Sequence, residues 1–261
     1  MTNLTSNLKQ MQDFARDYGL PADKKRAVVR EYLQSKIIAL IYREKIAQEI
    51  YFVGGTALHL LYGLDRFSED LDFDVPEISR KDIKNLLRTV SGELKKENFR
   101  HDFYTNLKEN KDYFELRFPE ILSAGQVSAD KDEKLMIKLD FEASWGKQTS
   151  ETVFLNRFGF LASVVTKTQG QFMVEKLAAV VGRAEIEGRD IYDLVWLYAQ
   201  GARPDAKFAK NNGYDIKELI KKAQEKYSLA KLSVLKLKLA PFLLNEAEVA
   251  RLDFFPLIIS L

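Results

Sequence analysis

The chain has 261 residues, of which 40 are Lys or Arg, 38 are Asp or Glu, two are His and none is Cys. Apolar residues make up 46% and charged residues 30% of the chain, a composition that excludes a disordered protein and allows one large domain or two modest ones. The lack of Cys excludes disulfides, zinc–thiolate sites and thiol nucleophiles, and with two His residues we expect neither a Ser-His-Asp arrangement nor a histidine-rich metal site.

No apolar run approaches the length needed to cross a bilayer, and the N-terminal residues lack the basic-then-apolar pattern of a signal peptide. We therefore expect a cytoplasmic protein that does not enter a membrane. The formal net charge of +2 neither favours nor excludes a nucleic-acid partner, because an average says nothing about how charge is distributed.

The spacing of apolar residues predicts the elements in the first part of the chain. A spacing of three to four residues predicts helix, and alternation predicts a half-buried strand. The first fifty residues have helical spacing on both sides of a break at Gly19-Leu20-Pro21. The elements expected next are a strand over 51–53, a helix over 56–62, a strand over 69–75 that ends at Pro76, and an amphipathic helix over 83–94.

The second part of the chain changes in character. We expect a hairpin from residues 99–107 and 113–118, strands over 135–141 and 152–156, and helices from Gly170 almost to the end. Mixed elements followed by a helical run predict an α+β fold of two domains, an α/β domain with N-terminal helices over 1–168 and a helical domain over 169–261.

Three aspartates recur at every second residue of the strand over 69–75. Side chains two apart on a strand share a face, so Asp70, Asp72 and Asp74 are expected to project together, while Leu71, Phe73 and Val75 face the core. Like charges side by side repel each other unless a cation lies among them. Oxygen ligands without nearby Cys or His suit Mg²⁺ or Mn²⁺ better than zinc.

A glycine pair precedes this strand. Gly54 and Gly55 lie between a strand and a helix, where backbone amides can approach a phosphate closely and the helix N-terminus adds its positive dipole end. Thr56 could add a hydroxyl contact. A glycine pair by itself is also an ordinary turn, and an Asp-x-Asp pair by itself is common on solvent-facing strands; their close spacing favours a phosphate and metal site.

The segment GGTALHLLYGLDRFSEDLDF, residues 54–73, resembles the signature of the nucleotidyltransferase toxins of the AbiEii/AbiGii type, a branch of the polymerase-β-like nucleotidyltransferases. The resemblance implies a mixed sheet flanked by helices. It places phosphate contacts on the glycine pair, metal ligands on Asp70 and Asp72, and supporting contacts to phosphates or to the carboxylate strand on Arg66 and Ser68. Asp74 lies outside the motif and is interpreted as a strand-end residue.

The superfamily usually has a third carboxylate on a neighbouring strand, often the base for the incoming hydroxyl. Asp140 is our candidate for this metal ligand and Glu142 the alternative. Both share one face of the expected strand with Met136 and Lys138.

Lys176 and Arg183 are two turns apart on one face of an expected helix, and a Gly-Arg-Asp-Ile-Tyr-Asp-Leu segment follows. Two such cations are usually a solvated helix face. The same toxin family, however, has a Lys-x-x-Ala-x-x-x-x-Arg helix and then an Arg-Asp-x-x-Asp-Leu segment. The resemblance therefore implies that Lys176 contacts the nucleotide phosphates, with Arg183 adding charge, and that Asp190 and Asp193 form an acidic pair that completes the nucleotide site. We favour Asp190 as the essential acid; it could instead be a helix N-cap.

Residues 203–238 contain ten Lys or Arg and four Asp or Glu, an excess of +6. Such helices could hold an RNA backbone, with Tyr214 and Tyr227 available to stack on bases, or could be an ordinary charged surface.

The leading hypothesis is a metal-dependent nucleotidyltransferase that moves NMP from an NTP to an acceptor hydroxyl and releases pyrophosphate. The resemblance implies a tRNA 3′ end as acceptor, a role as the toxin of a toxin–antitoxin or abortive-infection pair, and a cognate antitoxin or transcriptional regulator as partner. The alternatives are a kinase-like phosphotransferase on the same scaffold, which would transfer the γ-phosphoryl group, and a non-catalytic protein that holds nucleotide or a partner.

Overall fold

The computed structural model describes residues 2–76, 78–107, 111–125, 127–143 and 145–258, with backbone alone for residues 2–9, 107 and 111. The chain forms two compact units. Unit 1 comprises residues 1–62, 67–144 and 152–166, and unit 2 comprises residues 63–66, 145–151 and 167–261. The longest segment of unit 2 begins at residue 167, and two short earlier segments also belong to this unit. Within the described ranges, no helix is long and apolar enough to cross a membrane.

Unit 1 begins with helices, as expected for the first fifty residues, and contains further helices later in the chain. Its helices are α1 (Thr2–Asp17), α2 (Lys25–Ile41), a 3₁₀ helix η1 (Lys45–Glu49), α3 (Gly54–Tyr62), α4 (Arg80–Lys96) and α5 (Ile121–Ala124). The start of α3 differs from the expectation, because the glycine pair itself forms the first turn of this helix. The short α5 was not expected, since four residues carry no readable period.

The main sheet of unit 1 is mixed and has five strands. They are β1 (Tyr51–Val53), β2 (Asp70–Val75), β3 (Asp102–Leu107), β4 (Lys111–Phe118) and β5 (Leu135–Ala143), in the order β1-β2-β5-β4-β3. The β2–β5 pair is parallel, and the other pairs are antiparallel. The hairpin expected between residues 99 and 118 is present as β3 and β4; residues 108–110 at its turn lie outside the described residues.

A separate two-stranded sheet consists of β6 (Ser150–Arg157) and β7 (Phe160–Lys167). The strand β7 was not predicted from the sequence. Its side chains alternate in burial over the first half and are buried throughout the second half, so the strand has no continuous alternation to recognise. The hydroxyl of Thr166 in β7 donates to the Phe52 carbonyl of β1 at 2.7 Å, which ties the two sheets together.

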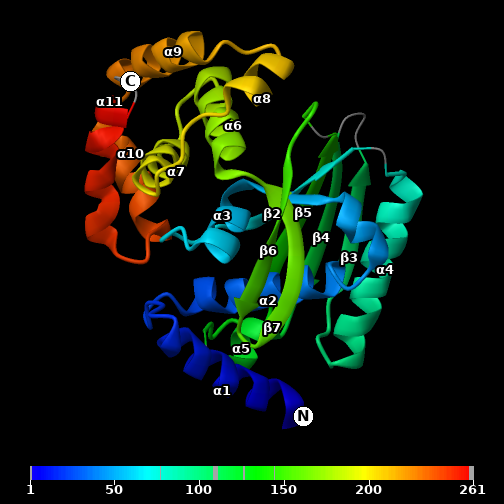
Figure 1. The fold of residues 1–261 in the computed structure, drawn as a ribbon. Helices are drawn as coiled ribbons and strands as arrows, with labels where there is room; N and C mark the ends of the chain where they lie inside the picture. The colour runs from blue at the N-terminus through cyan, green and yellow to red at the C-terminus, as the bar shows by residue number, and fades with distance from the viewer. Residues whose placement is uncertain (1, 77, 108–110, 126, 144, 259–261) are drawn as a thin grey trace. The chain divides into compact units, whose positions relative to one another are not determined.

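One face of the main sheet carries the core of unit 1. The rings of Phe52, Phe73, Phe141 and Phe114 form a chain across four strands, with neighbouring centroids 5.4, 4.7 and 5.6 Å apart. Helix α4 buries its apolar stripe, and α2 lies beside α4 and β5 (Figure 1). The opposite face of the sheet therefore remains for polar side chains. One detail of the expected alternation was wrong: Val75 is half-buried and Asp74 is buried, because the strand ends there and its last side chain leaves the core.

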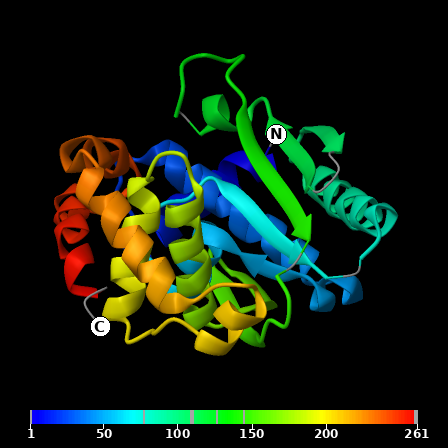
Figure 2. The same cartoon turned by 90° about the horizontal axis from the view of Figure 1, so that it is seen from above.

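Unit 2 is helical. It contains α6 (Gln169–Gly182), α7 (Gly188–Ala199), α8 (Ala206–Asn211), α9 (Ile216–Leu229), α10 (Leu232–Leu239), the 3₁₀ helices η2 (Ala240–Phe242) and η3 (Glu246–Phe254), and α11 (Phe255–Ile258). Figure 2 shows these elements, coloured yellow-green to red, gathered into one bundle. Trp145 belongs to this unit because its ring stacks on Phe208 and Tyr214, with both centroid distances 5.5 Å.

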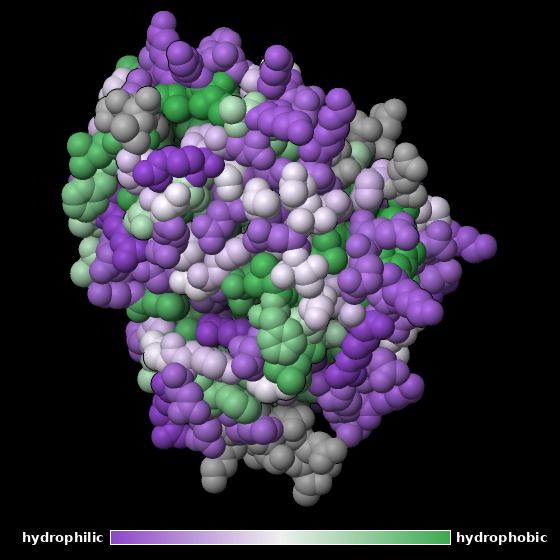
Figure 3. All heavy atoms as spheres, viewed as in Figure 1, coloured by the Kyte–Doolittle hydropathy of each residue, from purple (hydrophilic) through white to green (hydrophobic). Residues whose placement is uncertain are grey.

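Several large apolar side chains of unit 2 remain at the surface. Leu229 is 85% exposed and Leu237 is 76% exposed. Hydrophobic residues also reach the surface over η3 and α11, at the left edge of Figure 3, where Phe254 and Leu257 are exposed. Neighbouring exposed apolar side chains of this kind are a feature of interaction surfaces.

Candidate active site

The glycine pair and the aspartate strand meet in unit 1. Gly54 has a φ of +76°, a conformation that side chains other than that of glycine rarely adopt. A Cβ atom added to Gly54 would lie 2.3 Å from Oδ2 of Asp72. The backbone at the start of α3 is therefore in direct contact with the Asp72 carboxylate, and only glycine fits between them.

Three hydrogen bonds hold the start of β2 and the loop that leads into it. The hydroxyl of Thr56 donates to the backbone carbonyl of Asp70, so its single donor is already used within the fold. The buried amide of Gln34, on α2, donates to the carbonyls of Ser68 and Glu69 at 3.1 and 2.9 Å. Gln34 has no local sequence signal, because its partners lie more than thirty residues away.

The parallel pairing of β2 and β5 brings the candidate carboxylates together. Asp72 is paired with Asp140, and Glu142 is paired with Asp74. The backbones of neighbouring strands lie about 4.8 Å apart, so paired residues are close neighbours. Register therefore favours Asp140 over Glu142 as the partner of Asp72. The side chain of Asp70 is 44% exposed and that of Asp140 is 4% exposed, so this group of carboxylates reaches from the interior of the sheet face to solvent.

The chemistry of these donors fits a hard divalent cation, since each offers carboxylate oxygen and they lie on adjacent strands in register. As the side chains stand, however, the described part of the chain holds no group of three or more His, Cys, Asp or Glu arranged to bind a metal ion. The ammonium of Lys138, on β5, lies among them instead, 3.0 Å from Oδ2 of Asp140 and 4.0 Å from Oδ2 of Asp70.

The second set of expected residues forms a buried ion network in unit 2. Nζ of Lys176, on α6, lies 2.7 Å from Oδ2 of Asp193 and 3.1 Å from Oδ1 of Asp190, both on α7. Burial opposes the charge on Lys176, but attraction to Asp193 and Asp190 outweighs burial and raises the pKa of its ammonium. Lys176 is therefore a positioned, fully charged lysine with 14% of its side chain exposed.

Asp190 contacts both cations of the expected helix face, because Nε of Arg183 lies 3.3 Å from its Oδ2. The alternative that Asp190 is an N-cap was wrong. Glu187 precedes α7 in the capping position, and Asp190 lies within the first turn of the helix.

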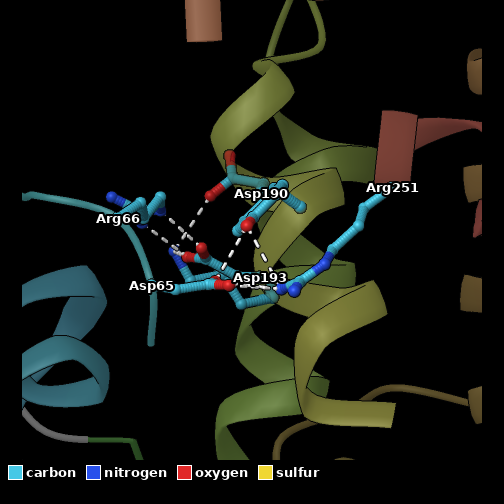
Figure 4. A network of polar contacts seen from close by, with 7 residues as sticks. Asp65, Arg66, Asp190, Asp193 and Arg251 are labelled. Carbon is cyan, nitrogen blue, oxygen red and sulfur yellow. Dashed lines mark hydrogen bonds and ion pairs between the residues drawn. The ribbon is translucent and has the colours of Figure 1, made fainter. Parts of the chain in front are cut away.

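Arg66 is buried in the same network. Its Nε and Nη2 donate to Oδ1 and Oδ2 of Asp193 at 2.6 and 2.7 Å, a bidentate pair (Figure 4). Burial raises the energy of the Asp193 carboxylate, yet Arg66 and Lys176 overcome this effect and hold its pKa below the ordinary value. The guanidinium of Arg66 is therefore paired with a carboxylate of α7.

A neighbouring cluster extends this network toward η3. Tyr192 donates its hydroxyl hydrogen to Asp65 at 2.8 Å. Nη1 of Arg251 lies 2.7 Å from the second oxygen of Asp65 (Figure 4). Burial is the main cause that raises the pKa of the Tyr192 hydroxyl, and the hydrogen bond to Asp65 raises it further. Sequence reasoning missed Asp65 and Arg251, since 186 residues separate them.

The two tyrosines of the basic segment 203–238 differ in how far their rings are exposed. Tyr227 is half-buried against Phe255 and donates to the Leu252 carbonyl at 2.8 Å, whereas Tyr214 stacks on Trp145 and is 38% exposed. Of the two, Tyr214 offers the more accessible ring.

The two histidines are buried in unit 1. His59 lies in an ion-pair contact with Glu31, and His101 shares a hydrogen bond with Ser91.

In unit 1, a glycine turn thus lies against a carboxylate strand, and a further carboxylate lies in register on the adjacent strand. The sequence model of the family described as "Nucleotidyl transferase AbiEii toxin, Type IV TA system" matches residues 38–254. The chain belongs to this family.

Solved structures agree on the fold. The crystal structure of JHP933 from Helicobacter pylori superposes with a TM-score of 0.54 at 23% identity, over 92% of this chain and 94% of that one. The nucleotidyltransferase toxin MenT4 from Mycobacterium tuberculosis superposes with a TM-score of 0.58 at 16% identity, over 96% of this chain and 89% of that one. The search of curated proteins found no match.

Membership of the family makes this protein a nucleotidyltransferase toxin of a type IV toxin–antitoxin system. Enzymes of this class use an NTP substrate and a divalent metal, and the toxin has an antitoxin as partner. The kinase-like and non-catalytic alternatives are therefore not supported.

Proposed function

We propose that this toxin transfers NMP from an NTP to the 3′ hydroxyl of a tRNA, with Mg²⁺ or Mn²⁺ held by Asp70, Asp72 and Asp140. The contact between Gly54 and Asp72 is the observation that carries the proposal. It joins backbone amides suited to a phosphate and a carboxylate suited to a metal in one place, as transfer from a triphosphate requires.

When bound, the metal would neutralise the triphosphate and lower the pKa of the attacking hydroxyl. The chain's own contributions are the first-turn amides of Gly54 and Gly55 for phosphate oxygens, and the carboxylate of Asp140 as acceptor for the hydroxyl proton. Arg66 and Ser68 would act indirectly, by holding the segment that leads into β2.

We also propose that Lys176 binds a phosphate oxygen, with Arg183 adding positive charge. An ammonium has three donors, and Asp190 and Asp193 fix its position while a further donor can reach an anion. Asp190, which contacts both cations, would be the essential acid of the pair.

The choice of tRNA as acceptor is supported by the charge and by one exposed ring of unit 2. The excess of +6 over residues 203–238 suits a polyanion, and the accessible ring of Tyr214 could stack on a base. A tRNA acceptor would place the reaction in the cytoplasm and stop translation, as expected of a toxin in abortive infection.

The test incubates the protein with Mg²⁺, total tRNA and each of the four NTPs in turn, labelled at the α or at the γ phosphate. We expect α label in tRNA from at least one NTP, and no transferred γ label. Asp72→Asn should abolish transfer, while Asp132→Asn, a change at an exposed aspartate of the loop before β5, should leave it intact. Transfer that survives in Asp72→Asn would overturn the proposal, and label found on protein instead of RNA would overturn the choice of acceptor.

A further inference from the structure

Lys138 lies inside the group of carboxylates that the proposed metal would occupy. It is two residues before Asp140 on β5, so both side chains project from the same face of the sheet. Register places Lys138 opposite Asp70 on β2 and opposite Glu115 on β4. A lysine is thus the central residue of a row with an acidic neighbour on each side.

The ammonium is directed at the oxygens of the candidate metal ligands. It is 3.0 Å from Asp140 and 4.0 Å from Asp70, and it lies 5.1 Å from the centre of the Tyr113 ring, which faces it from β4. Its side chain is 34% exposed, so a path toward solvent exists along the sheet face.

Metal binding would bring a second cation to this carboxylate. Oδ2 of Asp140 lies 3.0 Å from the ammonium nitrogen, and the oxygen of Asp140 that binds Mg²⁺ would lie about 2.0–2.1 Å from the metal. The two cations would then be neighbours that repel each other strongly. Asp140 is 4% exposed and has little freedom to move away, so the mobile group of the pair is the lysine.

Without metal, the lysine has a clear role. Asp70, Asp72 and Asp140 project from adjacent strands, and their mutual repulsion would destabilise the sheet if no cation lay among them. The ammonium supplies one positive charge at this place.

We propose that Lys138 is an exchangeable internal cation: it neutralises Asp70 and Asp140 in the metal-free protein and swings out toward solvent, still charged, when a divalent cation binds. The inference rests on the proposed metal site. It makes Lys138 a positioning residue that sets metal affinity, so that the toxin loads at a higher metal concentration than its carboxylates alone would require.

The experiment measures Mn²⁺ binding at low ionic strength, by electron paramagnetic resonance of free Mn²⁺, and thermal unfolding with and without Mn²⁺. Lys138→Met keeps an unbranched side chain only one atom shorter than that of lysine and removes its charge. We expect its Kd for Mn²⁺ to fall at least tenfold, its metal-free melting temperature to fall, and the rise in melting temperature caused by Mn²⁺ to become larger.

Two variants serve as comparisons. Lys138→Arg keeps the charge and should bind Mn²⁺ with nearly wild-type affinity. Lys134→Met removes a lysine that pairs with Asp102 at 3.1 Å, near the start of β5. It should change neither the Kd for Mn²⁺ nor the rise in melting temperature that Mn²⁺ causes.

Equal Mn²⁺ affinity of wild type and Lys138→Met would overturn this inference and leave the proposed function standing. Tighter binding by Lys138→Arg, to the same degree as Lys138→Met, would also overturn it, since charge would then not be the cause. No Mn²⁺ binding by either protein would overturn the metal site and, with it, both proposals.

Discussion

At the scale of single residues, Gly54 has the most restricted position in the candidate site. Its positive φ and its contact with Asp72 are two separate reasons for a glycine at this position. A comparison with a second glycine of the chain distinguishes their effects. Gly19 has a similar φ of +65° in the same unit, but a Cβ added there would meet no atom within 4 Å.

We predict that Gly19→Ala lowers the free energy of unfolding by about 1–2 kcal/mol, the cost of a left-handed alanine. Gly54→Ala should lose about 1–3 kcal/mol more, because its Cβ collides with the Asp72 carboxylate. Displacement of that carboxylate should also reduce nucleotide transfer roughly a hundredfold. Urea unfolding and the labelled-NTP assay measure the two effects; equal stability of the two variants would contradict the collision.

The residue scale also shows where sequence reasoning ends. Gly54, Asp70 and Asp72 could be proposed as site residues because the motif that contains them is local. The face shared by Lys138 and Asp140 was read correctly from alternation, but the lysine's role was not, because it depends on the pairing of β5 with β2. Thr56 was expected at a phosphate, and its hydroxyl instead bonds to a carbonyl that only the folded loop brings near.

At the scale of elements, the bidentate pair between Arg66 and Asp193 fixes the segment 63–66 to α7 within unit 2. Arg66 is 2% exposed, and Asp193 is fully buried. Removing one member of such a pair leaves a buried charge without its counter-ion, whereas removing both leaves no such charge.

We therefore predict that Asp193→Asn lowers the free energy of unfolding by about 3–5 kcal/mol. The double variant Arg66→Met/Asp193→Leu should be less destabilised than Asp193→Asn, since Lys176 keeps its contact with Asp190. Urea denaturation provides the comparison. As a control, Glu93→Gln removes a charge from an exposed ion pair on α4 and should leave the unfolding midpoint unchanged. If the double variant proves the less stable, the pair is not the main contribution.

Elements with a strong period were predictable and those without one were not. The apolar stripe of α4 follows a spacing of three and four, and that helix was expected. The strand β7 lacks continuous alternation and was missed. The strand order β1-β2-β5-β4-β3 could not be predicted from the sequence. In the chain, α4, β3 and β4 lie between β2 and β5, and no local pattern identifies such a distant partner.

At the scale of the whole molecule, the two compact units are not two consecutive stretches of chain. Residues 63–66 and 145–151 belong to unit 2, although they precede most of it in the sequence. Trp145 packs on Phe208 and Tyr214, and the amide of Gly146 donates to Asn212 at 2.8 Å. A cut at residue 168 therefore removes the partners of these early segments.

We predict that the fragment 1–168 is less stable than the full chain and exposes apolar surface, since Trp145 loses both aromatic partners. Its tryptophan emission should shift to the red, and it should bind the dye ANS more strongly than the full chain does. The fragment contains only one of the two Trp residues, so the full-chain variant Trp196→Phe is the matched spectroscopic control. A fragment that melts at the temperature of the full chain would show that the early segments do not depend on unit 2.

The long sequence separation within the Arg66–Asp193 pair also has a consequence for synthesis on the ribosome. The two residues are 127 positions apart. Ribosomes add about 5–20 residues per second, so Arg66 waits about 6–25 s after its own synthesis for its partner to be made. During most of this interval a nascent chain already contains Asp70 and Asp72 but lacks the helices of unit 2. A toxin that we propose acts on tRNA thus completes the Arg66–Asp193 pair only when most of its own translation is over.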